Sequence, residues 1–299
     1  MRTEWFKLAI FLSLLLWSLS AQNALAQTTH APPAAPIINA LRIQPRGESP
    51  YVDLHIPALE GKVTLQLPEL ISDRDRRLAY VYRNLKSGVE WRQQSGGVWK
   101  SNWRHDDLLA YQLTAAPTSD GISIDWTITN LTRNVWPYSA GTVCMRNQDA
   151  PLLFDSTLER TFLRKKGRWK AVRETVPQPG QFWFLPPGKE PCNLMRPLIE
   201  QGNWKLVDSV RPDEAIMAVR SRDEQWVLAQ AWHEARYLIA NTQTERKYAC
   251  TDVCPYLGDI APGQSVNVRG MIYYFRGNLE ALANKYQADL KRKRISLAK

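Results

Sequence analysis

Apolar and polar residues alternate along much of the chain. This pattern predicts β-strands, because successive side chains of a strand point to opposite faces of a sheet. The clearest pair is residues 108–115 and 122–129, joined by a Pro-Thr-Ser-Asp-Gly link that suits a hairpin. The second of these strands would turn four side chains toward the core: Ile122, Ile124, Trp126 and Ile128. Further strands are predicted at residues 51–56, 62–67 (ended by Pro68), 135–144, 216–219, 226–232, 237–240 and 265–275.

Helical periodicity is convincing in one segment only. Its apolar residues follow the i, i+3, i+4, i+7, i+11 spacing of an amphipathic helix: Leu279, Leu282, Ala283, Tyr286 and Leu290. Many short strands, Pro/Gly turns and no alternation of strand with helix favour an all-β fold. We therefore predict a large two-sheet antiparallel β-sandwich with one C-terminal amphipathic helix. It would form a single domain over residues 37–290, followed by a basic tail at 291–299.

The N-terminus has a pattern of its own. An apolar run at residues 8–19 follows a short basic start and precedes Ala-Leu-Ala at 24–26, the small-x-small pattern of a signal peptidase site. The run is shorter than the roughly 20 residues that span a bilayer as a helix. We predict a secretory signal peptide at residues 1–26, with an uncleaved membrane anchor as the alternative, and a flexible Pro/Ala-rich lead-in at 27–36. The mature protein would be periplasmic or extracellular, with no transmembrane span.

Composition adds two constraints. An apolar content of 44% is enough for a full core and excludes global disorder. The formal net charge is +10, with basic clusters at residues 164–170 and 291–294. Such clusters can bind nucleic acid, acidic polysaccharide or anionic lipid, but a solvated loop and a solvated helix end explain them better. Export also argues against nucleic acid, which leaves carbohydrate or an anionic envelope polymer as the natural partner.

Four cysteines remain after signal removal: Cys144, Cys192, Cys250 and Cys254. An even count in an oxidising compartment predicts disulfides. Of the three pairings we favour Cys250–Cys254, closing a tight loop, and Cys144–Cys192, stapling a longer one. The Cys-x-x-x-Cys spacing differs from that of thiol oxidoreductases, and no set of thiols and histidines has zinc-finger spacing, so we expect no metal site and no cofactor.

The tripeptide Trp-His-Glu at 232–234 is the most suggestive candidate for chemistry, because it follows an apolar strand at the point where side chains leave the sheet. His233 and Glu234 are adjacent and would point to opposite faces, so each needs a partner elsewhere. Arg236 would share the face of Glu234, and Asp252 would lie in the predicted Cys-closed loop. A structural histidine held by a backbone carbonyl is the alternative.

His105 is the second catalytic candidate. It precedes Asp106 and Asp107 in a polar loop, so it could form an acid–base pair with one of them or bind a metal. A turn capped by aspartate side chains is the simpler interpretation.

Aromatic residues are the other lead toward a ligand. Five of them lie among turn or polar residues, where we expect partial exposure: Trp99, Trp103, Trp136, Tyr138 and Trp183. Flat aromatic rings in a groove stack on the faces of sugars. The alternative is that these rings close the ends of the sandwich.

Two segments resemble galactose mutarotase-like domains of bacterial extracellular β-sandwiches. One is Gly-Ile-Ser-Ile-Asp-Trp-Thr-Ile-Thr-Asn at 121–130, which runs on to Trp136. The other is Leu-Gly-Asp-Ile-Ala-Pro-Gly at 257–263, with the long strand 266–275 after it. The resemblance implies a two-sheet supersandwich with a sugar site, in which an enzyme would use a histidine and a glutamate from separate strands. The C-terminal block is also similar to uncharacterised secreted bacterial proteins.

Three functions remain, in order of preference. The first is a non-catalytic extracytoplasmic β-sandwich that recognises a carbohydrate or envelope polymer through exposed aromatics. The second is a carbohydrate-active enzyme of mutarotase-like architecture that uses His233 or His105 with a carboxylate. The third is a structural or protein-interaction domain. The sequence has no Gly-x-Ser-x-Gly elbow, P-loop, HExxH motif or dinucleotide fingerprint, which argues against serine hydrolases, nucleoside triphosphatases, zincins and Rossmann enzymes.

Overall fold

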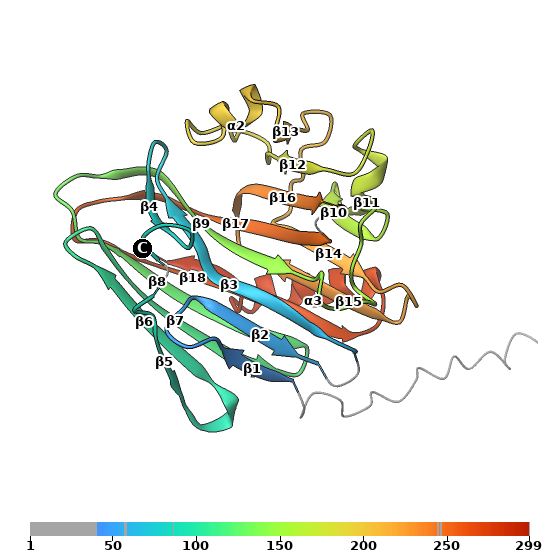
Figure 1. Cartoon of the computed structure of the whole chain (residues 1–299), viewed down its shortest axis with the longest axis horizontal. Coiled ribbons are helices and arrows are strands. Elements are labelled where there is room, and N and C mark those ends of the chain that lie inside the picture. Colours follow the sequence, from blue (N-terminus) through green and yellow to red (C-terminus); the bar gives the residue numbers. More distant parts are fainter. Residues whose placement is uncertain (1–40, 57–58, 86, 244, 246, 299) are drawn as a thin grey trace, which may run out of the picture. The chain divides into compact units, whose positions relative to one another are not determined.

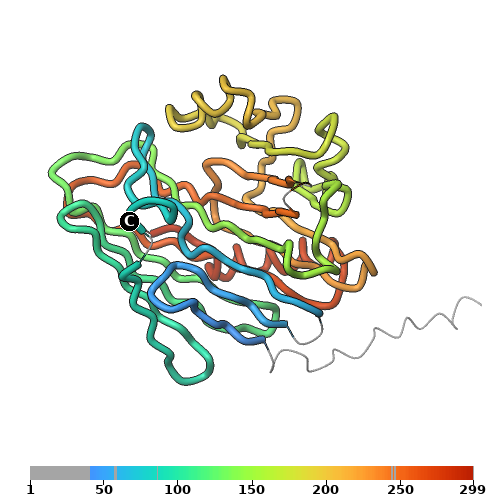
Figure 2. The backbone as a smooth tube through the Cα atoms, in the orientation of Figure 1, coloured from blue at the N-terminus to red at the C-terminus, as the bar shows by residue number. Residues whose placement is uncertain are grey.

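Two large β-sheets, paired almost wholly in antiparallel fashion, dominate the described part of the chain (Figure 1). The computed structural model describes residues 41–56, 59–85, 87–243, 245 and 247–298. Within these ranges the predicted all-β sandwich is confirmed, and Figure 2 traces the same path as a backbone tube. The predicted signal peptide at 1–26 and the lead-in at 27–36 lie outside the described residues.

The first sheet lies toward the reader in Figure 1. In order across the sheet its strands are β1 (Arg42–Pro45), β2 (Tyr51–His55), β3 (Lys62–Ser72), β9 (Trp136–Arg146), β17 (Tyr248–Ile260), β16 (Ala235–Gln243), β12 (Gln181–Phe184) and β13 (Lys205–Leu206), with β4 (Arg77–Tyr80) paired to β3. Only β12 and β13 run parallel among these neighbours.

The second sheet lies behind the first. In order across it are β11 (Arg168–Ala171), β10 (Thr161–Lys165), β14 (Ile216–Arg220), β15 (Trp226–Ala231), β18 (Ser265–Arg276), β8 (Gly121–Asn130), β7 (Leu109–Thr118), β6 (Trp99–His105) and β5 (Glu90–Gln93), with β19 (Ser296–Ala298) paired to β18. The predicted hairpin is β7–β8, paired from Leu109 opposite Asn130 to Thr118 opposite Gly121.

The core lies between the inner faces of the two sheets, because the apolar positions of the alternating strands point there. The four side chains predicted to face the core from β8 are each at most 1% exposed: Ile122, Ile124, Trp126 and Ile128. Trp126 reaches across to Gly141 of β9, where an added Cβ would lie 2.3 Å from the indole ring. A side chain at Gly141 would therefore push β9 away from the core.

The C-terminal helix α3 (Leu279–Lys291) confirms the helical prediction. Asn278 caps it by accepting a hydrogen bond from the Ala281 amide at 2.9 Å. Its apolar side packs on the outer face of β14, β15 and β18, so the second sheet is covered on both faces there. The other helical pieces within the described ranges are short: η2 (Ser95–Gly97), η3 (Val172–Glu174) and α2 (Arg196–Glu200). Among the described residues, no helix is both long and apolar enough to cross a bilayer.

Several short strands were not predicted, and three further differences from the prediction bear on the site. Residues 250–254, expected to form a Cys-closed loop, lie inside the 13-residue strand β17, because small and polar residues on a buried outer face hide the usual alternation. Strand β3 continues past Pro68 through a cis Leu67–Pro68 bond and a shift in register. The polar loop expected around His105 begins only after β6, whose residues alternate between buried and exposed.

Candidate functional site

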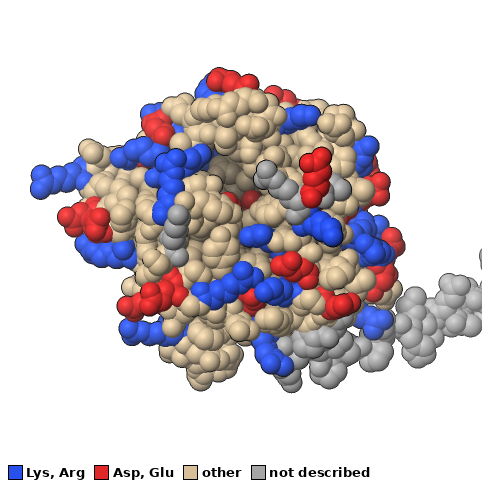
Figure 3. All heavy atoms as spheres, viewed as in Figure 1, with Lys and Arg blue, Asp and Glu red and all other residues tan. Residues whose placement is uncertain are grey.

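The outer face of the first sheet carries a row of side chains contributed by five neighbouring strands. In the strand register Gln66 of β3 lies opposite Cys144 of β9, which lies opposite Asp252 of β17. Ile239 of β16 and Trp183 of β12 continue the row. Figure 3 shows this face hollowed near its centre, with acidic atoms visible at the floor of the hollow.

Two segments lie over parts of this row. On one side, residues 185–206 pack apolar side chains against Trp183 and Ile239, and the Trp183 and Trp204 rings stack 4.8 Å apart. On the other side, the hydroxyl of Tyr82, which follows β4, accepts a hydrogen bond from Gln66 Nε2 at 3.4 Å. Between these two segments, the side chains of Gln66, Cys144 and Asp252 are buried although they lie outside the sandwich core.

Two thiols and a carboxyl group meet in this row. The Sγ atoms of Cys144 and Cys250 and a carboxylate oxygen of Asp252 all lie within 4.8 Å of one another, and all three residues are at most 3% exposed. The Cys250 thiol donates toward Asp252 Oδ2 at 3.9 Å, and the Tyr248 hydroxyl lies 3.7 Å from Cys144 Sγ. Burial raises the pKa values of Asp252 and Cys144 well above their usual ranges.

Glu69 adds a carboxyl group to the same face, on β3 beyond Pro68. Burial raises the pKa of Glu69 to about 7, and the positive charge of Arg146 offsets only part of that effect. A carboxyl group with a pKa near neutrality can take up or release a proton at physiological pH, which is the property of a general acid or base. Its role was not predicted from the sequence, because the prediction ended the strand at Pro68.

A second cluster joins three of the predicted site residues, Tyr138, Glu234 and Arg236. The Arg236 guanidinium is fully buried, lies 4.5 Å from the centroid of the Tyr138 ring and donates to the Asp73 carbonyl at 3.2 Å. Lys189 Nζ pairs with Glu234 at 2.7 Å and lies 3.5 Å above the ring of Tyr256. Within this cluster Lys189 and Glu234 form an ion pair, whereas the buried Nε and Nη2 of Arg236 have no hydrogen-bond partner among the described residues.

The two histidine candidates are not brought together. His233 is exposed in the turn between β15 and β16. His105 lies at the end of β6, which β18, β8 and β7 separate from β15 in the sheet. Its Nδ1 is 3.5 Å from Asp106 Oδ2, and both Asp106 and Asp107 are exposed. Among the described residues, no histidine takes part in a group with metal-ligand geometry.

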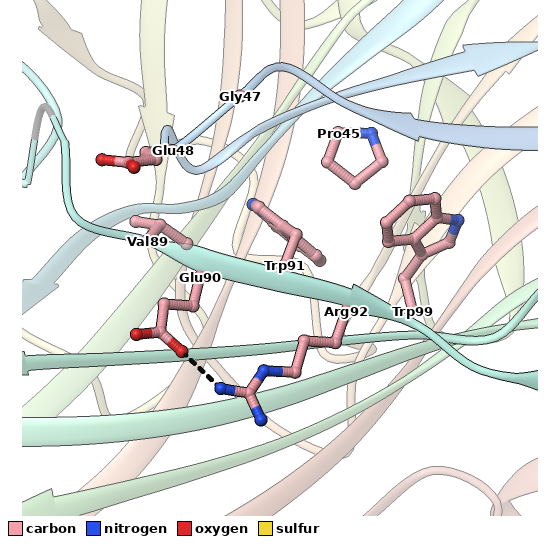
Figure 4. Close-up of a pocket in the computed structure, with 8 residues that line it drawn as sticks. All are labelled: Pro45, Gly47, Glu48, Val89, Glu90, Trp91, Arg92 and Trp99. Atoms are coloured by element: carbon pink, nitrogen blue, oxygen red, sulfur yellow. Dashed lines mark hydrogen bonds and ion pairs between the residues drawn. The ribbon is translucent and has the colours of Figure 1, made fainter.

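The third place of interest is a pocket of about 460 Å³ at the edge of the sandwich (Figure 4). It is lined by Pro45, Gly47, Glu48, Val89, Glu90, Trp91, Arg92 and Trp99. The register places Trp91 and Trp99 on the same face of the β5–β6 hairpin, and both indoles are half-exposed. The Trp91 Nε1 donates to the Ser49 carbonyl at 2.8 Å, which fixes that ring beside the β1–β2 turn.

Three of the five aromatic residues expected to be exposed are buried, and for these the prediction is wrong. Trp136 is 0%, Trp183 6% and Trp103 7% exposed. Each lies in a strand whose neighbours pack over it. The prediction of exposure rested on the polar residues beside it in the sequence, which do not report this packing. Trp99 and Tyr138 are half-exposed.

The predicted disulfides are also corrected, because all four cysteines are free thiols. Cys250 and Cys254 lie on one extended strand, about 13 Å apart at roughly 3.3 Å per residue, which is too far for a bridge. Cys144 lies beside Tyr248 and Asp252, whereas Cys192 packs in the apolar cluster that contains Cys254.

Comparison with known proteins finds relatives by structure only. No family model and no curated sequence matches the chain. A galactose mutarotase-like protein from Lactobacillus casei has a TM-score of 0.44 at 8% identity, covering 79% of this chain and 100% of its own. A putative aldose 1-epimerase from Escherichia coli K12 has a TM-score of 0.45 at 9% identity, covering 79% and 99%. A galactose mutarotase related enzyme from Lactobacillus acidophilus has 0.44 at 8%, covering 80% and 98%.

These neighbours belong to the same group of proteins that the sequence resembles. Identities and TM-scores this low assign no activity and no site residue to the chain.

Proposed function

We propose that the protein binds a saccharide chain at the pocket of Trp91 and Trp99. The observation that carries this proposal is the pair of half-exposed indoles on one face of the β5–β6 hairpin, lining a shallow pocket of about 460 Å³. Indole rings stack on the apolar faces of sugars, while their edges stay wet. Glu48 lies at the rim and can accept hydrogen bonds from sugar hydroxyls, whereas Glu90 and Arg92 project from the opposite face of β5 (Figure 4).

The position of the pocket favours a polymer over a small enclosed ligand. The β5–β6 hairpin projects beyond β1 in Figure 1, so its aromatic face overhangs the edge of the first sheet. Glu90 and Arg92 pair with each other at 3.0 Å on the exposed side of β5. A chain lying along such an open edge meets rings on one side and solvent on the other.

Binding of polysaccharides to the mature protein tests this proposal, first on a glycan array and then by calorimetry. Trp99→Ala and Trp91→Ala should each weaken binding about tenfold or more, because a stacked ring contributes on the order of 1.4 kcal/mol. Trp204→Ala is the matched control, since it removes a half-exposed indole outside the pocket. Absence of binding to any glycan, or equal binding by all variants, would contradict the proposal.

Glu69 supports a second candidate, acid–base chemistry on a ligand held in the hollow of the first sheet. The supporting observation is the position of Glu69, partly buried on β3 near the charge of Arg146, where burial raises its pKa to about 7. Polarimetry of freshly dissolved aldoses tests it: the wild type should speed the change in rotation with an apparent pKa near 7, and Glu69→Gln should not. Glu200→Gln, at an exposed position, is the control. A wild type that never exceeds the buffer rate rejects this candidate.

We also propose export, supported by the apolar run and Ala-Leu-Ala pattern at the N-terminus. N-terminal sequencing of the protein recovered from cells should find a chain that begins near Gln27. Recovery of chains that begin at Met1 in the cytoplasm would contradict it.

A further inference from the structure

We propose that Cys144, Cys250 and Asp252 form a binding site for a Zn²⁺ ion on the outer face of the first sheet. The site is distinct from the proposed saccharide pocket and does not depend on it. The sequence predicted no metal site, because its ligands come from two strands far apart in the chain. Only the pairing of β9 with β17 brings them together.

The distances fit a tetrahedral metal after small side-chain rotations. Zn–S bonds of about 2.3 Å and Zn–O bonds of about 2.1 Å place a sulfur about 3.6 Å from an oxygen ligand and about 3.8 Å from a second sulfur. Here Cys250 Sγ lies 3.9 Å from Asp252 Oδ2, and all three ligand atoms lie within 4.8 Å of one another. The Met145 amide donates to Asp252 Oδ1 at 3.3 Å, which orients the carboxylate.

The charges of the site also suit a cation. Among the described residues no ion pair reaches Asp252. Arg146, which lies opposite Cys250 in the register with its guanidinium 5.0 Å from the centroid of the Tyr248 ring, brings one positive charge near Cys144. That charge would balance the net negative charge of Zn²⁺ with two thiolates and one carboxylate. A buried carboxyl group and two buried thiols are stable as neutral, protonated groups or as ligands of a metal ion. On binding, Zn²⁺ would displace the protons of both thiols and of the Asp252 carboxyl group to solvent.

An orphaned acceptor marks the remaining coordination position. Gln66 is fully buried, lies directly opposite Cys144 in the register, and its Oε1 has no hydrogen-bond partner. Its Nε2 donates to Tyr82, which leaves the oxygen free to accept from a water on the metal. Three protein ligands with one open position are typical of zinc sites that bind a further molecule.

The ligand set favours zinc over copper and over a disulfide. Carboxylate oxygen is a poor ligand for Cu⁺, whereas Zn²⁺ accepts thiolate and carboxylate together. Cys144 and Cys250 are diagonal neighbours across β9 and β17, because Cys144 lies opposite Asp252 and Cys250 opposite Arg146. Diagonal Cα atoms lie about 7–8 Å apart, beyond the usual span of a disulfide.

Metal titration of the reduced mature protein tests the site. We expect one Zn²⁺ per chain in competition with a chelator, and a Co²⁺ complex with thiolate-to-metal charge-transfer absorption. Cys144→Ser and Cys250→Ser should abolish that absorption and weaken Zn²⁺ binding at least tenfold. Asp252→Asn should weaken binding and keep the absorption. Cys192→Ser is the matched control, a buried thiol outside the cluster, and should bind as the wild type does.

Alkylation of the wild type gives a readout that does not depend on the folding of variants. Zn²⁺ should slow labelling of Cys144 and Cys250, but not of Cys192, when the sites are mapped by peptide mass spectrometry. The proposal is overturned if reduced wild type takes up no ion, if labelling ignores Zn²⁺, or if folded Cys144→Ser and Cys250→Ser bind like the wild type. A Cys144–Cys250 disulfide in protein purified without reductant would overturn it as well.

Discussion

The hollow of the first sheet and the pocket at the sandwich edge differ in solvent exposure: the polar groups of the hollow are buried, and the aromatic groups of the pocket are partly exposed. In the hollow, Cys144 and Asp252 are almost fully buried, so desolvation dominates and pKa values move. At the edge, Trp91 and Trp99 stay half-exposed, and the charges of Glu90 and Arg92 are wet. The hollow is suited to holding protons or a metal ion, whereas the edge is suited to contact with a large ligand.

The largest expected difference between the two regions is in stability. Trp183, which borders the hollow, is 6% exposed and stacks on Trp204, so Trp183→Ala should lower the free energy of unfolding by about 3 kcal/mol. Trp99→Ala should lower it by no more than about 1 kcal/mol, because a half-exposed ring loses little burial. Urea denaturation of both variants measures this. Equal losses would mean that Trp99 belongs to the core and would weaken the case for a binding surface.

In the metal-free protein, Glu69 should have a smaller effect on the free energy of unfolding, and this effect should depend on pH. Its folded pKa of about 7 lies above the usual 4.5, so the unfolded chain releases this proton first as the pH rises. Wild type should therefore lose stability relative to Glu69→Gln between pH 4.5 and 7. The difference should reach about 1–2 kcal/mol at pH 8, allowing for the part of the side chain that water screens. Denaturation curves at pH 4 and pH 8 check this, and parallel behaviour at both would show that Glu69 is solvated.

The pKa of Asp53, on the same face of the first sheet, is shifted in the opposite direction. Substitution of Asp53 should have the smallest effect on the free energy of unfolding. Burial alone would raise its pKa, but hydrogen bonds from Arg46, Lys62 and Thr64 outweigh burial and lower the pKa to about 2. The stabilisation is present above the usual pKa of 3.8 and is lost as the pH falls to about 2. Asp53→Asn should cost about 1 kcal/mol at pH 7, since both cations are partly exposed, and clearly less at pH 2, where the folded carboxyl group is partly protonated.

If Asp53→Asn instead lost the same free energy at pH 7 and pH 2, the loss would come from packing and hydrogen bonding in both forms of the carboxyl group. Glu69 and Asp53 lie on the same face of the first sheet, and their pKa values are shifted in opposite directions. Direct hydrogen bonds from Arg46, Lys62 and Thr64 favour the charged form of Asp53, whereas Glu69 has only the more distant charge of Arg146 to offset its burial.

The fold was predictable where the buried face of a strand carries aliphatic side chains, but not in β6, whose buried face includes Ser101. The β7–β8 hairpin and helix α3 follow from such patterns, because periods of 2.0 and 3.6 residues are written directly in the sequence. Strand β17 was not predictable in this way, since Cys250, Asp252 and Cys254 occupy a buried outer face with small and polar side chains. The same cause produced the wrong disulfide pairing, which assumed a loop where the chain is extended.

By itself, the sequence determined the all-β class, the C-terminal helix and the identity of residues able to do chemistry. It could not determine which of those residues meet or which are dry. The contact among Cys144, Cys250 and Asp252 depends on the register between β9 and β17, and the exposure of Trp99 depends on a hairpin that overhangs the other sheet. Both are long-range properties, because sheet pairing joins segments far apart in the chain. A local sequence pattern predicts a strand but not the strand with which it pairs.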